Sequence, residues 1–200
     1  MKTNETFRQT QTFQNLTNAF AGESQARTRY TFFAEAASRN GYKHIEKIFQ
    51  ETAENEREHA KVFYRLLLNH AGAGIIHVNA DYPLVEHDTL TNLRAAAAGE
   101  KEEWSVLYSS FGDKAQQEGY PDVAEAFRKI AEIERRHEAR FNTLANEMAD
   151  GSIFKKEGNT LWKCLNCGYV HQGPEAPGTC PACQHPQGYF EVLAENYQMT

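Results

Sequence analysis

The first 150 residues contain four stretches in which apolar side chains recur every three or four positions, which is the period of an amphipathic helix. Predicted helices therefore cover about residues 9–38, 43–70, 88–118 and 121–150. Glycines follow the first three stretches, Asp88 and Thr89 are suitable N-caps for the third, and Pro121 suits the first turn of the fourth. The pattern predicts an all-α four-helix bundle.

The connection between the second and third predicted helices, residues 74–87, is much longer than the other turns. A bundle whose helices simply alternate up and down needs only short loops. A long connection instead indicates a segment that crosses the bundle, so we expect four helices with one long crossover.

The character of the sequence changes after Gly151, where helical periodicity stops and glycine, proline, cysteine and aromatic residues dominate. We interpret residues 1–150 as the helical domain, 151–159 as a linker and 160–200 as a small β and loop module. So short a module has too little core to fold alone, and a bound metal is the expected stabilising element.

One glutamate interrupts the apolar stripe near the middle of each predicted helix. These residues are Glu23, Glu56, Glu100 and Glu134. Glu56 and Glu134 each open a Glu-x-x-His motif, which ends at His59 and His137. Glu56 follows Glu23 by 33 residues and Glu134 follows Glu100 by 34, so the two halves of the bundle repeat one arrangement. All six side chains are expected to point into the bundle at mid-height.

A pair of divalent metal ions would remove the cost of several kcal/mol for each buried, unpaired carboxylate. Two glutamates plus two Glu-x-x-His motifs form the ligand set of a two-metal site inside a four-helix bundle, and oxygen with imidazole donors suits iron or manganese. A single Glu-x-x-His is more often solvated or ion-paired, and only the repetition favours metal binding. Glu103, three residues after Glu100, either shares the inward face or is a rim charge. Other charges, such as Glu138 and Arg140, are predicted to lie on solvated faces.

The module carries two Cys-x-x-Cys pairs, formed by Cys164, Cys167, Cys180 and Cys183. Two such pairs give a tetrahedral site of four thiolates. Gly168 lets the backbone turn so that its N–H groups face sulfur. Geometry alone leaves two metals open, namely a structural zinc and a redox-active single iron.

Composition narrows the class of protein. The chain has 200 residues, 40% of them hydrophobic, and a formal net charge of −6, which argues against nucleic acid as a partner. No apolar run is long enough for a membrane span, and nothing at the start indicates export. We therefore expect a cytoplasmic protein, in which four clustered cysteines are metal ligands rather than disulfides. His44, His70, His77 and His87 belong to no ligand pattern and receive no predicted role.

Nearly the whole chain resembles the rubrerythrins, which combine a ferritin-like bundle with a C-terminal rubredoxin-like module. The resemblance is carried by Ala21-Gly22-Glu23-Ser24-Gln25-Ala26-Arg27, Glu56-Arg57-Glu58-His59-Ala60-Lys61, Ala97-Ala98-Gly99-Glu100, Glu134-Arg135-Arg136-His137-Glu138, and Cys180-Pro181-Ala182-Cys183 before His185-Pro186. Free-standing rubredoxins have glycine where Gln184 stands, a difference that bears on the potential of the iron.

The resemblance implies two non-haem irons, bridged by carboxylate or oxo ligands, and a third iron held by the four cysteines. It implies that Glu56 and Glu134 bridge, that Glu23 and Glu100 are terminal ligands, and that His137 binds one iron. It also implies a seventh ligand, because the family equivalents of His59 and Glu103 exchange on the other iron with redox state. Tyr30 is similar to a family tyrosine that hydrogen-bonds near the site, although a core aromatic explains it equally well.

The activity implied by the resemblance is a peroxidase that reduces hydrogen peroxide to water in defence against oxidative stress. Its electrons come from a donor such as rubredoxin or an NAD(P)H-linked reductase, and the chain forms a head-to-tail homodimer or higher homo-oligomer. A ferroxidase or iron-handling protein and an oxygen-reducing diiron protein are alternatives with the same bundle. A zinc-ribbon interaction protein is the alternative that is not an enzyme.

Overall fold

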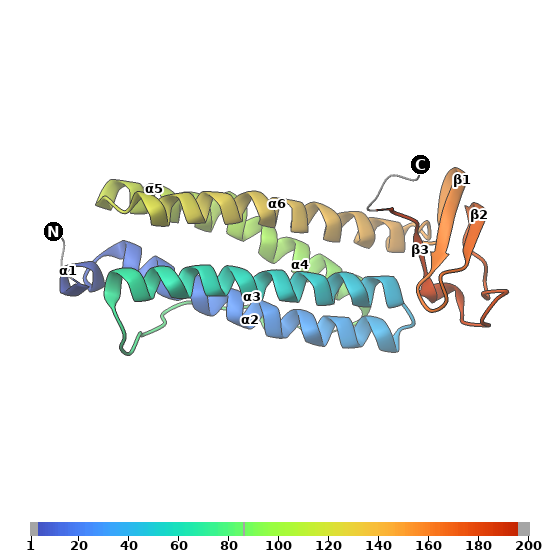
Figure 1. Ribbon diagram of the computed structural model, residues 1–200, viewed down its shortest axis with the longest axis horizontal. Coiled ribbons are helices and arrows are strands. Elements are labelled where there is room, and N and C mark those ends of the chain that lie inside the picture. The colour runs from blue at the N-terminus through green and yellow to red at the C-terminus, as the bar shows by residue number, and fades with distance from the viewer. Residues whose placement is uncertain (1–3, 86, 196–200) are drawn as a thin grey trace.

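The computed structural model describes residues 4–85 and 87–195, and its long axis follows four helical rods (Figure 1). The helical elements are α1 (Asn4–Arg8), α2 (Gln11–Arg39), α3 (Lys43–Ala71), α4 (Thr89–Glu102), the π-helical turn η1 (Glu103–Leu107), α5 (Tyr108–Glu118) and α6 (Pro121–Ala149). The predicted four-helix bundle with one long crossover is confirmed, because α2 pairs with α3 and the continuous rod α4-η1-α5 pairs with α6. Among the described residues, no helix is long and apolar enough to cross a membrane.

Two features of the helices differ from the sequence prediction. The short helix α1 precedes the bundle and is separated from α2 by a turn. The third predicted helix is interrupted by η1, whose π-helical hydrogen bonds close one residue later than those of an α-helix. A π turn therefore absorbs one extra residue without breaking the rod, and η1 begins three residues after Glu100, the glutamate at the middle of that rod.

The apolar core is divided into two clusters by a polar layer at mid-height. One cluster contains Phe33, Phe49 and Phe141 and lies toward the module, whereas the other contains Leu16 and Phe63 and lies toward α1. Asp88 accepts a hydrogen bond from the Thr91 backbone as the N-cap of α4, and Pro121 stands at the start of α6. Apolar packing thus lies on both sides of the layer that carries the charged residues.

The C-terminal module is a small antiparallel sheet beside two cysteine loops. Its elements are β1 (Lys155–Cys164), β2 (Val170–Glu175), the turn η2 (Gln187–Tyr189) and β3 (Phe190–Val192), and the strand order is β2-β1-β3. β1 begins inside the stretch 151–159 that the sequence analysis interprets as a linker, because Lys155 pairs with Glu175 in β2. The module contacts the end of the bundle where α2 turns into α3.

The contact between module and bundle is close. A Cβ atom added to Gly188 would lie 1.6 Å from the Gly41 carbonyl oxygen, so only glycine fits there. The rings of Tyr42 and Phe154 stack with centroids 6.1 Å apart. His44 is 7% exposed at this contact, and its Nδ1 has no hydrogen-bond partner in the described part of the chain. Burial, together with the charge of Lys156, lowers the pKa of His44 to about 4.

We expect acid to weaken the fold through His44. Its folded-state pKa of about 4 lies below the ordinary 6.5, so the contribution of the neutral ring is fully present above pH 6.5 and lost as pH falls toward 4. Between pH 7 and pH 5 the wild type should lose about 2 kcal/mol of unfolding free energy that His44→Gln retains. Urea unfolding at several pH values measures this. The exposed His77→Gln should follow the wild type, and parallel curves for His44→Gln and wild type would contradict the prediction.

Candidate metal centre

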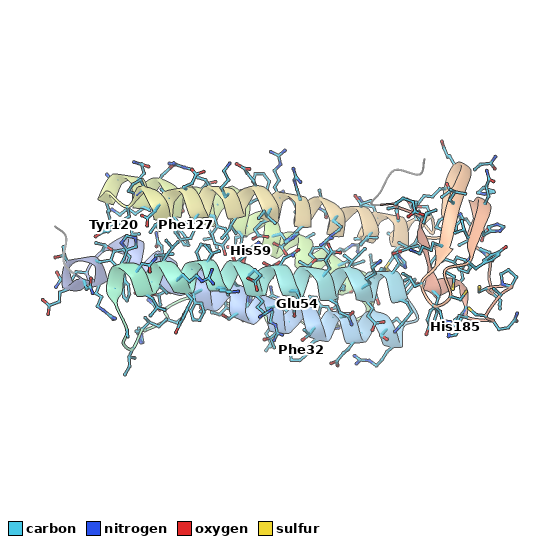
Figure 2. The ribbon with its side chains drawn as sticks, in the orientation of Figure 1. Phe32, Glu54, His59, Tyr120, Phe127 and His185 are labelled. Atoms are coloured by element: carbon cyan, nitrogen blue, oxygen red, sulfur yellow. The ribbon has the colours of Figure 1, made fainter. Side chains whose placement is uncertain are left out.

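The polar layer is built by helices that each present side chains at the same height. α2 contributes Glu23, α3 contributes Glu56 and His59, α4 contributes Glu100, and α6 contributes Glu134 and His137. None of these six side chains is more than 7% exposed. His59 lies at the middle of the bundle, far from the cysteine module (Figure 2).

The six side chains form two overlapping groups. In the first, ligand atoms of Glu23, Glu56, His59 and Glu134 all lie within 4.8 Å of one another. In the second, Glu56, Glu100, Glu134 and His137 meet the same limit. Glu56 and Glu134 belong to both groups, so the arrangement has two positions for cations with two shared carboxylates between them.

The donor atoms of this layer fit cations. Among the described residues, buried carboxylate oxygens on Glu23, Glu56, Glu100 and Glu134 have no hydrogen-bond donor from outside the layer, and those of Glu134 face only His59 Nδ1 and His137 Nδ1, each at 2.8 Å. Buried polar atoms normally have hydrogen-bond donors or acceptors of their own, so this concentration of carboxylate oxygens that share two imidazoles indicates bound cations. Four carboxylates and two imidazoles match the preference of iron for oxygen and nitrogen donors.

The electrostatics of the side chains in this layer show how crowded it is. Burial raises the pKa of Glu23 and Glu100 well above the ordinary value, and the charge of Glu56 adds to this. Burial would also raise the pKa of Glu56, but hydrogen bonds with His137 and His59 lower it to about 2. His59 Nδ1 lies 2.9 Å from Glu56 Oε2 and 2.8 Å from Glu134 Oε1, which holds its pKa high despite burial. Metal ions compete with these protons, so binding releases them.

Two tyrosines fix Glu23 and Glu100, the carboxylates that each belong to one group only. Tyr30 Oη donates to Glu100 Oε1 at 2.6 Å, and Tyr108 Oη donates to Glu23 Oε1 at 2.5 Å. Tyr30 was a candidate from sequence, whereas Tyr108 was missed. The sequence did contain a signal: Tyr30 follows Glu23 by seven residues and Tyr108 follows Glu100 by eight, the extra residue lying in the stretch that forms η1.

Glu103 lies outside both ligand groups. It is the first residue of η1, is half-buried, and lines a cavity of about 370 Å³ between α2, η1 and the crossover. Burial and the charges of Glu134 and Glu56 raise its pKa well above the ordinary value. In this structure His59, and not Glu103, therefore completes the first group.

Two charges that were expected to be solvated are half-buried instead. Glu138 accepts a hydrogen bond from Trp104 Nε1 at 2.6 Å. Arg140 Nη2 donates to Thr52 Oγ1 at 2.5 Å, and its Nη1 donates to Glu51. The expectation failed because neighbouring helices cover these positions, which the pattern of a single helix does not reveal.

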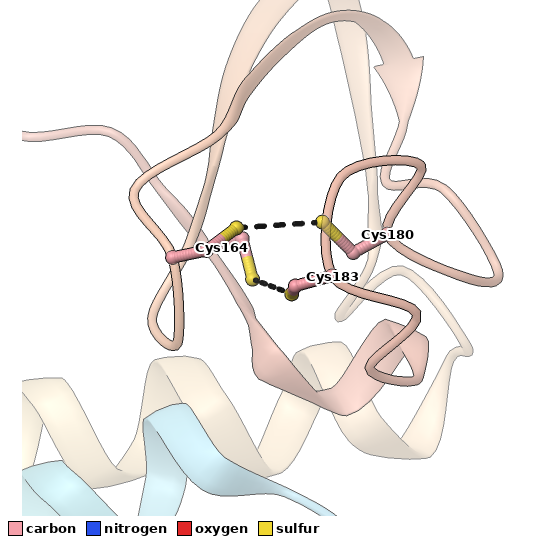
Figure 3. A group of neighbouring side chains, drawn as sticks. Cys164, Cys180 and Cys183 are labelled. Atoms are coloured by element: carbon pink, nitrogen blue, oxygen red, sulfur yellow. Dashed lines mark hydrogen bonds between the residues drawn. The ribbon is translucent and has the colours of Figure 1, made fainter.

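The four cysteines form a second site at the edge of the module (Figure 3). Sγ of Cys164 lies 3.7 Å from Sγ of Cys183, and Sγ of Cys167 lies 3.7 Å from Sγ of Cys180. A tetrahedral ion with metal–sulfur bonds of about 2.3 Å has its sulfurs about 3.8 Å apart, so the four positions fit one metal. The His185 backbone N–H lowers the pKa of the Cys183 thiol to about 6, which favours the thiolate.

The comparisons with known proteins agree with this architecture. The chain matches the rubrerythrin family model over residues 14–145 and 91–161, and the model of the rubrerythrin rubredoxin-like domain over residues 162–191. A rubrerythrin of Clostridium perfringens is 53% identical over 189 residues, with 94% of this chain and 97% of the relative covered. A rubrerythrin of Porphyromonas gingivalis is 47% identical over 195 residues, with 97% and 96% covered.

Solved structures give the same result. Fully reduced nigerythrin superposes with a TM-score of 0.63 at 31% identity, covering 91% of this chain and 86% of that one. Bacterioferritin of Desulfovibrio desulfuricans, at 18% identity and a TM-score of 0.63, covers 70% of this chain and 80% of its own and shares the bundle fold. Fold and sites define a ferritin-like diiron protein with a rubredoxin-like four-cysteine module. The chain belongs to the rubrerythrin family.

Proposed function

We propose that this protein is a peroxidase that reduces hydrogen peroxide to two molecules of water, consuming two electrons and two protons. The observation that carries the proposal is the presence in one chain of a two-metal ligand set and a four-thiolate site. A ferroxidase or storage protein needs the first and has no use for the second. A redox pathway explains both sites, because a single iron in the four-cysteine site can deliver electrons one at a time to the two-iron site, which uses two for each peroxide.

For the ligands, we infer that Glu56 and Glu134 would be shared between two irons and that the remaining donors would divide between them. Glu23 and His59 would serve one iron, and Glu100 and His137 the other. Glu103 would replace His59 on the first iron when the redox state changes. When bound, the two ferrous ions supply the electrons and the Lewis acidity that polarises the oxygen–oxygen bond.

The protein side chains contribute geometry and exclusion of water. Tyr30 and Tyr108 each leave one oxygen of a terminal carboxylate free by bonding the other, which fixes the carboxylate before substrate arrives. The aromatic clusters above and below keep the layer dry. The cavity on the crossover side is lined by Tyr108, which holds Glu23, and would give a molecule as small as peroxide a route toward the layer.

Anaerobic stopped-flow mixing of the reduced, iron-loaded protein tests the activity. Metal analysis should first find about three irons per chain, since a zinc-ribbon protein would contain zinc and no iron. The cysteine-bound iron, followed by its absorbance, should then reoxidise at least about tenfold faster with peroxide than with dioxygen. A tenfold difference in rate corresponds to about 1.4 kcal/mol in the activation free energy. Faster reaction with dioxygen would favour the oxygen-reducing alternative and reject the peroxidase.

We also infer that electrons reach the two-iron site from a second copy of the chain, after an external donor such as a rubredoxin or an NAD(P)H-linked reductase has loaded the module. Thirteen residues of α3 separate Glu56 from Lys43, so at about 1.5 Å per residue the site lies about 20 Å from the end of the bundle where the module begins. A head-to-tail dimer would place the module of one chain beside the diiron site of the other.

The dimer predicts that activity depends on protein concentration. Because the mass-action equilibrium favours monomers on dilution, turnover per chain should fall as sedimentation shows dimers dissociating. Peroxide turnover and analytical ultracentrifugation at matched concentrations provide the measurement. A monomer that keeps full activity would reject the dimeric pathway and leave the peroxidase itself untouched.

A further inference from the structure

The crossover between α3 and α4 is fastened to α2 around Asn18. The side chain of Asn18 forms two hydrogen bonds with the backbone of Asn79: Nδ2 donates to the carbonyl oxygen at 3.0 Å, and Oδ1 accepts from the N–H at 3.2 Å. Tyr82 Oη donates to the backbone oxygen of Asn18 at 2.9 Å. Three hydrogen bonds, each worth about 1 kcal/mol, therefore hold this part of the crossover against α2.

The ring of Tyr82 lies over a position of α2 that has no side chain. Gly22 follows Asn18 by four residues on α2, and a Cβ atom added to Gly22 would lie 3.7 Å from Tyr82 Cε1. The Tyr82 side chain thus covers Gly22, and it remains 38% exposed on its other side. We call Asn18, Gly22 and Tyr82 the entrance, because they form the contact between the crossover and α2 at the surface.

The entrance belongs to a cavity that reaches the metal layer. Asn18, Gly22 and Tyr82 all line the cavity of about 370 Å³, and so does Tyr108, which is 2% exposed. Tyr108 Oη donates to Glu23 Oε1 at 2.5 Å. The cavity therefore extends from a side chain in contact with solvent to a side chain in contact with a candidate metal ligand.

The volume of the cavity does not by itself select among peroxides. A water molecule takes about 30 Å³ of the liquid, so a cavity of about 370 Å³ has room for a hydroperoxide with several carbon atoms as well as for hydrogen peroxide. Selection by size must then take place where a molecule enters. Tyr82 is the largest of the three entrance side chains, so its ring sets the width there.

We propose that Tyr82 is a specificity-determining residue, whose ring narrows the entrance so that hydrogen peroxide passes and hydroperoxides with a branched alkyl group are excluded. The proposal rests on the peroxidase function, since it concerns which peroxides the two-iron site reduces. An alkyl hydroperoxide would consume the same two electrons and two protons, and cleavage of its oxygen–oxygen bond would give one alcohol and one water. The reaction is thus the same for both substrates, and access decides between them.

Anaerobic stopped-flow mixing of the reduced, iron-loaded, full-length protein with hydrogen peroxide and with tert-butyl hydroperoxide tests the proposal. Tyr82→Ala should raise the rate with tert-butyl hydroperoxide at least about tenfold and change the rate with hydrogen peroxide by less than about threefold. Tyr82→Phe keeps the ring and loses only the bond to Asn18, so it should raise the first rate by less than about threefold. Both bonds between Asn18 and Asn79 remain in these variants and hold the crossover in place.

Removal of ferrous iron by the chelator bipyridyl measures passage through the entrance without any peroxide. Tyr82→Ala should release the two irons of the bundle at least about fivefold faster than the wild type, because the chelator is a bulky, planar molecule. The cysteine-bound iron should leave at an unchanged rate and serves as the internal standard. Tyr82→Leu, whose side chain is smaller than the ring, replaces Tyr82→Ala in both measurements if the alanine variant does not retain two irons.

Tyr64 offers a matched control on the neighbouring helix. It is 48% exposed, lies on α3 and lines a different cavity together with Phe20. Tyr64→Ala removes the same ring from the surface of the bundle, so it should leave the rates with both peroxides and the release of iron unchanged.

The two measurements separate this proposal from the peroxidase function. If the protein reduces hydrogen peroxide but Tyr82→Ala gains nothing with tert-butyl hydroperoxide, or if Tyr82→Phe gains as much as Tyr82→Ala, the proposal is overturned and the peroxidase stands. If no variant reacts with any peroxide, the peroxidase function fails. Faster release of iron in Tyr82→Ala alone would then still support the entrance as the route to the site, and unchanged release would overturn that route as well.

Discussion

Replacing Glu134 by glutamine is expected to empty the two-iron site and leave the four-cysteine iron in place. Glu134 belongs to both ligand groups, and its two oxygens face only His59 Nδ1 and His137 Nδ1, each at 2.8 Å. An amide supplies one weak donor oxygen and no charge, so each cation position loses a ligand at once. Iron in the bundle should fall from about two per chain to nearly none, and peroxide turnover should fall by about 1,000-fold or more.

Metal analysis and the absorbance of the cysteine site measure this outcome together. The cysteine-bound iron serves as an internal standard for folding and loading, because it is held by a separate module. Glu132→Gln is the matched control: it lies two residues away, its side chain is 67% exposed, and it pairs with Lys129, so it should load like the wild type. A Glu134→Gln protein that retains two irons per chain would show that this carboxylate is not a bridge.

The bundle could be predicted from sequence because long helices repeat their signals. Each rod presents apolar residues over seven or more turns, and its ends are marked by residues with a local mechanism, such as Asp88 at the N-cap of α4. The inward direction of Glu23, Glu56, Glu100 and Glu134 follows from the same periodicity, since each is in phase with its stripe. The structure buries all four.

The parts that sequence missed depend on contacts between elements. The turn η1 shifts the phase of its rod by one residue, so Tyr108 does not fall where a continuous α-helix would place it. Arg29 looks like an ordinary helical arginine in the sequence, but in the fold it lies against Gly99 of α4 and is only 9% exposed. The composition of residues 151–159 is typical of a loop, but β1 begins at Lys155. Pairing with Glu175 in β2 defines the strand there, and composition does not reveal that pairing. A one-residue difference between the halves was present in the sequence, but only the fold shows which element contains it.

A methyl group at Gly188 is expected to separate the cysteine module from the end of the bundle. The added Cβ of Gly188→Ala would lie 1.6 Å from the Gly41 carbonyl oxygen and 2.8 Å from its carbon, distances that no rotation of a side chain can relieve. Because both partners are backbone, the module must move outward, and the stacking of Tyr42 on Phe154 and the Lys47–Glu191 ion pair are lost with it. We expect a loss of about 3 kcal/mol in the docked state, at the upper end of typical overpacking costs.

The effect should be visible as faster proteolysis within residues 151–154 and as faster amide exchange on both sides of the contact, with the absorbance of the cysteine site retained. Gly178→Ala is the matched control, because its added Cβ meets no atom within 4 Å and the residue belongs to the same module. Undocking also exposes His44, so Gly188→Ala should lose the acid sensitivity that burial of this imidazole creates. If Gly188→Ala keeps the steep pH dependence of the wild type, the module has stayed in place and the contact is more adaptable than its geometry indicates.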